Sequence, residues 1–456
     1  MPGPAVTVGL MNSSQKRRLP FYYGWVVVAV AFITMGVGVN ARTAFSLLFP
    51  PILDEFGWSR GSLAATFSIG FMVSALITPL IGIMMDKHGP RLVLPIGAAL
   101  VGTGLMLTTF AVLPWHFYLT LGVMVVGGSI FISYIGHTLF LPNWFIRRRG
   151  LALGLAFAGV GIGSVTIFPW MQHSIDTVGW RESCWVLAFI ILLVLVPLNI
   201  TFQRRRPEDM GLLPDGDKVP DATSERDNGE VVDRTIVDKD WVATDWTLAK
   251  AMRTRRFWWL MLSFICTLYA WYAVQVHQTR YLIDVGITAE TAALALGLVG
   301  LAGVMGQIVV GHLSDRMGRE WAYTLALLGF LSTYGCLYLL RQWPEVWLMY
   351  LMIGLQGFLG YGVSTVFAAT PADLFAGKHY GAIFGVLATA ASAGAALGPW
   401  TTGIFFDIWG DYDLAFTLAM VLCLLAIATM WIAAPRKVRL VQGQVRGQVR
   451  GRAPSD

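Results

Sequence analysis

The chain has 456 residues, of which 56% are hydrophobic and only 13% are Asp, Glu, Lys or Arg, and its mean hydropathy is +0.62. A water-soluble protein needs roughly twice that charged fraction on its surface, so the composition excludes a soluble multidomain protein and indicates an integral membrane protein. The four cysteines stand singly in apolar runs, without metal-site or disulfide spacing, and we expect neither a metal nor a cofactor.

Twelve apolar segments follow one another, each long enough to cross a bilayer. They are expected at 22–48, 62–83, 92–113, 117–140, 151–172, 182–202, 258–283, 290–312, 321–340, 346–370, 381–405 and 413–434. Between the sixth and the seventh, residues 203–256 are charged and poor in apolar residues, which predicts a linker. Within it, Thr244–Arg256 is expected to form an amphipathic helix on the membrane surface. The pattern predicts an all-α polytopic membrane protein with bundles at 22–202 and 257–435 and tails at 1–21 and 436–456.

The Lys and Arg residues mark one side of this arrangement. Nearly all of the 33 lie in the tails, the linker and the loops after even-numbered segments, whereas the other loops hold Arg60, Arg181 and Arg341. Because positively charged loops stay in the cytoplasm, we expect both termini and the linker to be cytoplasmic. The short loops and tails favour a bacterial inner membrane. The net charge of +6 is then a topology signal, and we expect no nucleic-acid partner.

The two halves of the chain repeat one another. The loop after the second segment, Gly82–Arg91 (GIMMDKHGPR), recurs after the eighth as Gly311–Arg319 (GHLSDRMGR). This duplicated pattern resembles the signature loop of the major facilitator superfamily, which implies two six-helix pseudo-repeats around a central site and a monomer. Its charges could pair and hold the halves together on the cytoplasmic side, and the plainer alternative is a positively charged loop with a helix-capping Asp. We call these the cytoplasmic gate residues: Asp86, Lys87, Arg91, Asp315, Arg316 and Arg319.

The first segment shows a finer resemblance. Gly24-Trp25, Arg42 and Trp58-Ser59 match in order the opening of the monocarboxylate transporter and oxalate–formate antiporter group. The eighth segment, Ala292–Gly311, departs from the mammalian members because it has no charge where they have an Asp and Arg pair. The resemblance implies a small monocarboxylate as substrate, but proton coupling through that pair is not available to this chain.

Arg42 and Arg280 are the only Lys or Arg residues placed inside the expected segments. A cation within hydrocarbon is costly, and no Asp or Glu is expected at mid-segment to neutralise either one. A substrate carboxylate would do so, since guanidinium binds carboxylate in a bidentate manner. The alternative is that both side chains reach along their helices to the membrane surface.

Four further polar side chains are candidates for the same site. His277 lies just under one helical turn before Arg280 and could bind substrate or carry a coupled proton, and His137 is a second histidine within a segment. Asn40 and Tyr134 lie on central segments and could contact substrate. For all four the alternative is a hydrogen bond inside the helical bundle.

These features predict a secondary active transporter for a small organic anion, with lactate or pyruvate as the leading case, coupled to a proton or to an exchanged anion. The chain has no Walker loop and no Ser, His and Asp arrangement, so we expect no enzyme activity. Two alternatives stay open. The same fold could export a drug-like or other organic solute, or the chain could be a sensor that signals through its linker.

Overall fold

The computed structural model describes residues 21–145, 149–216, 236–375, 379–441 and 444, without the side chains of residues 86, 149 and 150. These residues form helices and connecting turns, and one isolated antiparallel bridge pairs Ile236 with Arg439. Twelve segments within them are long and apolar enough to cross a membrane. The predicted all-α fold with twelve spans is confirmed.

The first bundle contains six spans, of which the first, fourth and sixth consist of several consecutive elements. In chain order the elements are α1 (Gly24–Thr43), α2 (Phe45–Phe56), α3 (Arg60–His88), α4 (Pro90–Thr108), α5 (Pro114–Phe117), η1 (Tyr118–Gly127), η2 (Gly128–Ile132), α6 (Tyr134–Thr138), η3 (Leu141–Asn143), α7 (Arg149–Val178), α8 (Trp180–Ile190), η4 (Ile191–Leu195) and α9 (Val196–Phe202). Short 3₁₀ turns follow at η5 (Pro207–Met210) and η6 (Pro214–Gly216).

The second bundle repeats this plan. Its elements are α12 (Arg255–Asp284), α13 (Ala289–Met317), α14 (Arg319–Gln342), α15 (Val346–Ile353), η7 (Gly354–Leu359), η8 (Gly360–Gly362), α16 (Val363–Phe375), α17 (Tyr380–Trp409), α18 (Asp413–Ala433) and η9 (Pro435–Lys437). Each bundle has its own apolar core, and the core of the first bundle also includes Val276, Ala293, Leu296, Ala395 and Ala396 of the second, which pack against it at the interface.

The described part of the linker before the second bundle is fastened to that bundle. It contains α10 (Lys239–Ala243) and α11 (Leu248–Met252), and the indole of Trp241 donates a 2.7 Å hydrogen bond to the carbonyl of Leu374. The single amphipathic helix expected over Thr244–Arg256 is instead divided. Thr254 caps a new helix by accepting from the Phe257 amide, so α12 begins at Arg255, and α11 forms a separate short turn.

The fourth and tenth spans are both irregular near their middle. In the fourth span the π-helix η1 passes into the 3₁₀ turn η2, and in the tenth span η7 passes into η8 in the same way. Such departures from α-helix are frequent at functional sites, since they re-aim side chains. Tyr134 follows η2 and Tyr361 lies in η8, so the two halves present a tyrosine at corresponding places.

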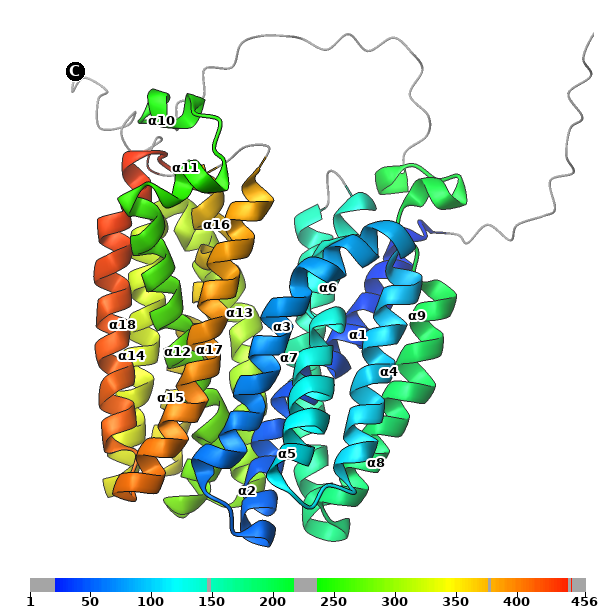
Figure 1. The fold of residues 1–456 in the computed structure, drawn as a ribbon, viewed down its shortest axis with the longest axis vertical. Helices are drawn as coiled ribbons and strands as arrows, with labels where there is room; N and C mark the ends of the chain where they lie inside the picture. Colours follow the sequence, from blue (N-terminus) through cyan, green and yellow to red (C-terminus); the bar gives the residue numbers. More distant parts are fainter. Residues whose placement is uncertain (1–20, 146–148, 217–235, 376–378, 442–443, 445–456) are drawn as a thin grey trace, which may run out of the picture.

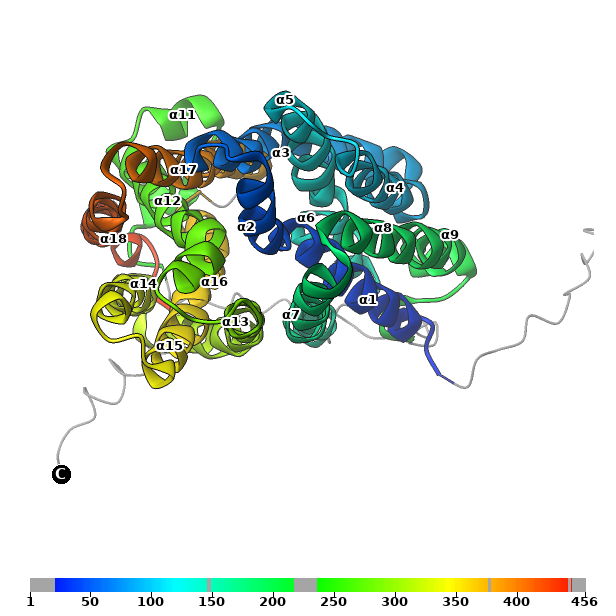
Figure 2. The same cartoon turned by 90° about the horizontal axis from the view of Figure 1, so that it is seen from below.

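We name the two ends of the molecule by what they hold. The Asp54 end has the connections near Asp54, Asp284 and Asp407, and the linker end has the connections 84–91, 203–216 and 311–319. In Figure 1 the ribbons of the two bundles meet toward the Asp54 end, at the bottom, and diverge toward the linker end, at the top. Figure 2, seen from below, shows α3 beside α17, α7 beside α13 and α2 against α12.

Close helix contacts between the bundles depend on small residues. A Cβ added to Gly403 of α17 would lie 2.7 Å from the Cα of Gly61 in α3. Ser164 of α7 donates a 2.8 Å hydrogen bond to the carbonyl of Gly297 in α13. Small residues allow helices in a membrane to approach this closely, so α3 packs tightly on α17 and α7 on α13.

Candidate functional site

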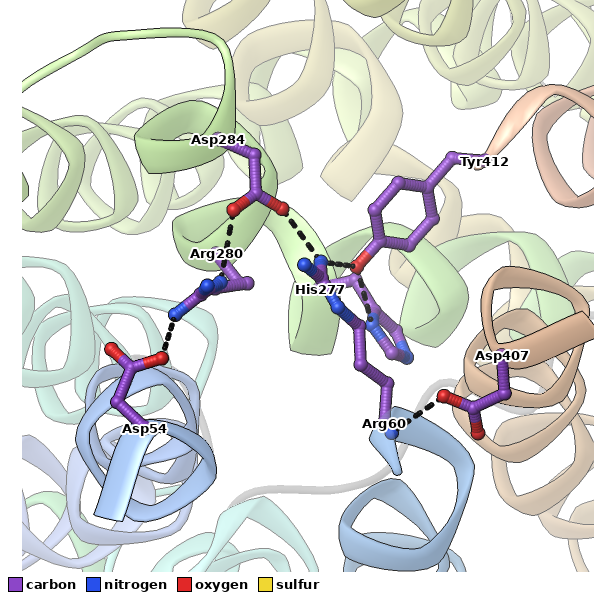
Figure 3. Close-up of polar contacts among 7 residues, drawn as sticks. All are labelled: Asp54, Arg60, His277, Arg280, Asp284, Asp407 and Tyr412. Atoms are coloured by element: carbon purple, nitrogen blue, oxygen red, sulfur yellow. Dashed lines mark hydrogen bonds and ion pairs between the residues drawn. The ribbon is translucent and has the colours of Figure 1, made fainter. Parts of the chain in front are cut away.

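Seven polar side chains from both bundles meet at the Asp54 end (Figure 3). We call these residues the inter-bundle network. The first bundle supplies Asp54 and Arg60, and the second bundle supplies His277, Arg280, Asp284, Asp407 and Tyr412. The network has three carboxylates and two guanidinium groups. Opposite charges from separate bundles therefore face one another across the interface.

Arg60 is the centre of this network. Its Nη1 lies 2.7 Å from Oδ2 of Asp284 and donates a 2.6 Å hydrogen bond to the hydroxyl of Tyr412. The guanidinium also stacks over the ring of Phe406, with its central carbon 3.6 Å from the ring centroid. Arg60 is the first residue of α3, so its place in the network follows directly from where that helix begins.

The start of α3 is itself held by the other bundle. The backbone amides of Arg60 and Gly61 donate hydrogen bonds of 2.8 and 2.7 Å to the two carboxylate oxygens of Asp407. The first amides of a helix have no partner within it, and the helix dipole favours a negative charge there. Asp407 thus caps a helix of the opposite bundle, and this cap requires the Asp54 end to be closed.

His277 is fully hydrogen-bonded and buried. Its Nε2 lies 2.9 Å from the carbonyl of Pro399, which can only accept, so Nε2 bears the proton. Its Nδ1 must then accept from the hydroxyl of Tyr412 at 3.2 Å. Burial raises the pKa of Tyr412 to about 12, so that hydroxyl keeps its proton. The structure places His277 as a support for Arg60 through Tyr412.

Arg280 has two carboxylate partners. Its Nη1 lies 2.7 Å from Asp54 and its Nε 3.0 Å from Asp284. The expectation that this cation lacks a counter-charge is wrong. Helices α2 and α12 extend past the apolar runs and include both carboxylates, which the sequence placed beyond the segment ends.

Arg42 is in a different situation. It lies on α1, one turn before Ser46, whose hydroxyl donates to the carbonyl of Val276 in the other bundle. Its guanidinium carbon lies 5.4 Å from the ring centroid of Phe71. Among the residues that the structure describes, Arg42 forms no hydrogen bond and no ion pair, so a positive charge stands uncompensated between the bundles.

Tyrosines from both halves lie near Arg42. The charge of Arg42 acts on the hydroxyls of Tyr134 and Tyr361, the two residues beside the irregular segments η2 and η8. Tyr134 also interacts with Gln307 of α13, across the interface. The charge of Arg42 therefore influences hydroxyl groups of both bundles. Arg42 and Tyr134 were expected at one substrate site, and that they bind a substrate together stays a prediction.

The family model described as Major Facilitator Superfamily matches residues 26–341 and 281–454 of this chain. The chain belongs to the major facilitator superfamily. It is therefore a multi-pass membrane transporter and not an enzyme.

Relatives within this superfamily are similar over most of their length. Human monocarboxylate transporter 11 is 27% identical over 436 residues, which cover 91% of this chain and 83% of that protein. Human monocarboxylate transporter 2 is 23% identical over 402 residues, covering 86% and 81%. The chain is thus a superfamily transporter related to the monocarboxylate transporters, as its first segment predicted.

Solved structures share the fold at low identity. A bacterial homolog of the human lysosomal transporter Spinster, inward-facing and occupied, aligns with a TM-score of 0.62 at 13% identity, covering 95% of this chain and 99% of that one. The nucleoside transporter NupG aligns with a TM-score of 0.65 at 9% identity, covering 91% and 100%. These likenesses concern the superfamily fold alone.

Two of the expected site residues are placed within the first bundle. Asn40 donates from its amide nitrogen to the carbonyls of Gly36 and Val160, at 2.6 and 2.9 Å, and so joins α1 to α7. His137 is fully buried, with Nδ1 2.9 Å from the carbonyl of Ser133. Both positions correspond to the alternative of a hydrogen bond inside the bundle.

The cytoplasmic gate residues lie at the linker end. Arg319 pairs with Asp315 at 2.8 Å and with Asp373 at 2.7 Å, and Arg91 donates a 2.6 Å hydrogen bond to the carbonyl of Ile200. Each of these contacts stays within one bundle. Lys87 and Arg316 are exposed, and the side chain of Asp86 lies outside the described residues.

Most residues of the inter-bundle network were not predicted from the sequence. Asp54, Asp284 and Asp407 follow apolar runs and look like ordinary loop carboxylates, and Tyr412 looks like an interfacial aromatic. One signal was available. Arg60 is one of only three Lys or Arg residues in the loops that follow odd-numbered segments. A cation on the side that has few positive charges is expected to have a specific anionic partner.

Proposed function

We propose that this protein is a secondary active transporter that moves a small monocarboxylate anion, such as pyruvate or lactate, across a bacterial inner membrane. The observation that supports this most strongly is the guanidinium of Arg42, which has no hydrogen-bond or ion-pair partner among the described residues. A carboxylate is the ligand that satisfies such a group best, because it accepts two parallel N–H bonds. The relatives named as monocarboxylate transporters agree with this chemistry.

The substrate contacts follow from the surroundings of Arg42. The carboxylate would lie on Arg42, and the hydroxyls of Tyr134 and Tyr361 would donate to its oxygens or to a neighbouring oxygen of the substrate. Arg280 and His277 would not contact the substrate. They would act indirectly, by holding the Asp54 end closed while substrate is bound. Asn40 and His137 would support the first bundle.

In the transport cycle the protein would be closed in turn at the Asp54 end and at the linker end. With both termini and the linker in the cytoplasm, the Asp54 end faces outward, and the inter-bundle network is the outer gate in its closed state. Rocking of the bundles would break this network and bring the cytoplasmic gate residues together at the linker end. A coupled proton or an exchanged anion would drive the cycle, and the protein would work as a monomer.

The test is uptake of labelled pyruvate and lactate into vesicles that contain the purified protein, with and without an imposed pH gradient. Accumulation that depends on the gradient supports proton-coupled transport, and uptake that requires an internal anion supports exchange. No uptake under either condition by folded protein, as judged by its thermal unfolding, would overturn the monocarboxylate assignment.

A further inference from the structure

An aromatic cluster that includes rings of both bundles lies beside Arg42. Phe71 of α3 lies against the guanidinium, and Tyr272 of α12 packs on Phe71 with ring centroids 4.4 Å apart. Tyr272 also contacts Phe67 of α3, at 6.0 Å. Since α3 and α12 belong to different bundles, the rings of Phe71 and Tyr272 lie in the interface and not against lipid.

A second group of rings continues from Tyr272, since Trp271 packs against it with ring centroids 6.2 Å apart. Trp271 stacks on Tyr361 with centroids 4.2 Å apart and planes at 24°, and Tyr361 is within the electrostatic reach of Arg42 and Tyr272. Tyr134 meets the edge of Phe157 at 4.9 Å. Phe71 thus contacts Arg42 directly, and Tyr272, which packs on Phe71, brings a ring of the second bundle to the same region.

Several of these rings are incompletely buried. Trp271, Tyr272 and Tyr134 retain exposed surface, whereas Tyr323 and Tyr334, which lie inside the second bundle, are fully buried and bonded to backbone or hydroxyl partners. Tyr272 packs on Phe71 of the opposite bundle, next to the guanidinium of Arg42, so its exposed surface lies at the interface between the bundles. That surface is available to a ligand on Arg42.

We propose that the preferred substrate is a monocarboxylate with an aromatic ring, whose carboxylate binds Arg42 while its ring packs against the exposed surface of Tyr272. A three-carbon acid would satisfy the guanidinium and leave the ring surfaces uncovered. An aromatic acid covers both, and offset or edge-to-face ring contacts add attraction beyond the buried area. This inference rests on the proposed function, since it names the substrate class of the same site.

The experiment compares pyruvate with phenylpyruvate, which has the same 2-oxo acid group and differs by one phenyl ring. Initial uptake rates into vesicles would be measured over a range of concentrations of each labelled acid. The half-saturating concentration is expected to be at least tenfold lower for phenylpyruvate. Tyr272→Leu should raise the half-saturating concentration of phenylpyruvate about two- to tenfold, which corresponds to the free energy of one aromatic pair. The half-saturating concentration of pyruvate should change less than twofold.

Two control variants separate this contact from a general structural effect. Tyr272→Phe keeps the ring and should keep the preference for phenylpyruvate, and Tyr350→Leu alters an exposed tyrosine of α15 and should change neither acid. Equal half-saturation by the two acids, or an equal loss for both in Tyr272→Leu, would overturn this inference and leave monocarboxylate transport intact. Uptake of neither acid would overturn the proposed function as well.

Discussion

Asp407 is expected to control how often the Asp54 end opens. Its carboxylate accepts the amides of Arg60 and Gly61 from the opposite bundle, and these two bonds exist only while that end is closed. Asp407→Asn removes the charge and leaves one oxygen that can accept, so at least one bond is lost. Asparagine has nearly the same shape, so the packing of α17 should be unchanged.

The size of the effect follows from the bonds. A hydrogen bond to a charged group contributes about 1.5–3 kcal/mol, and a carboxylate at a helix N-terminus gains about 0.3–1 kcal/mol from the dipole. Asp407 is exposed, so solvent weakens both effects, and we take about 1.4 kcal/mol in total. The ratio of open to closed protein at the Asp54 end should then rise about tenfold.

Electron spin resonance distances between two labels would measure this ratio. Val178 at the end of α7 and Glu345 before α15 are exposed, lie at the Asp54 end and belong to different bundles, so cysteines there would report their separation. The four native cysteines are buried and compete little for the label. Asp407→Asn should increase the population with the longer distance.

The matched control is Asp413→Asn. Asp413 pairs with Arg341 at 2.8 Å, but both residues belong to the second bundle, so its loss should not favour either state. An unchanged distance distribution in Asp407→Asn would refute the reasoning. So would an equal shift in Asp413→Asn, because the effect would then come from any lost carboxylate at this end.

Two further substitutions test the closed interface. Gly403→Ala places a Cβ 2.7 Å from the backbone of Gly61 and should favour the open Asp54 end in the same distance measurement, whereas Gly385→Ala, on the same helix with no atom near its added Cβ, should have no effect. Tyr412→Phe removes the hydroxyl that Arg60 donates to and should raise the open population about three- to tenfold, the range of one lost hydrogen bond. A Tyr412→Phe protein with the wild-type distance distribution would show that this hydroxyl does not stabilise the gate.

The fold was readable from the sequence for a simple reason. A bilayer requires each span to be a long apolar helix, so twelve apolar runs specify twelve helices, and the duplicated loops at Gly82 and Gly311 specify the repeat. Arg42 was readable on the same ground, because a cation inside an apolar run is rare. The start of α12 could not be predicted from the sequence, because it depends on which of several threonines caps the helix.

The inter-bundle network was not readable because it depends on which chain connections face one another. Asp54 and Arg280 lie far apart in sequence, and nothing in either segment records that α2 packs against α12. The role of Tyr272 was hidden in a similar way. Aromatic residues are common in membrane helices, and only the packing shows which of them border Arg42.

The most direct test of the central claim is binding of phenylpyruvate and pyruvate to the purified wild-type protein and to Arg42→Gln, measured by calorimetry. Arg42 has no ion pair among the described residues, so the substitution should leave the melting temperature unchanged or raise it slightly. If Arg42 binds the carboxylate, removing one partner of this charge pair should cost about 2–5 kcal/mol of binding free energy. Binding of both acids should then be at least about thirtyfold weaker. Affinities within threefold of the wild type, in folded Arg42→Gln protein, would contradict the account.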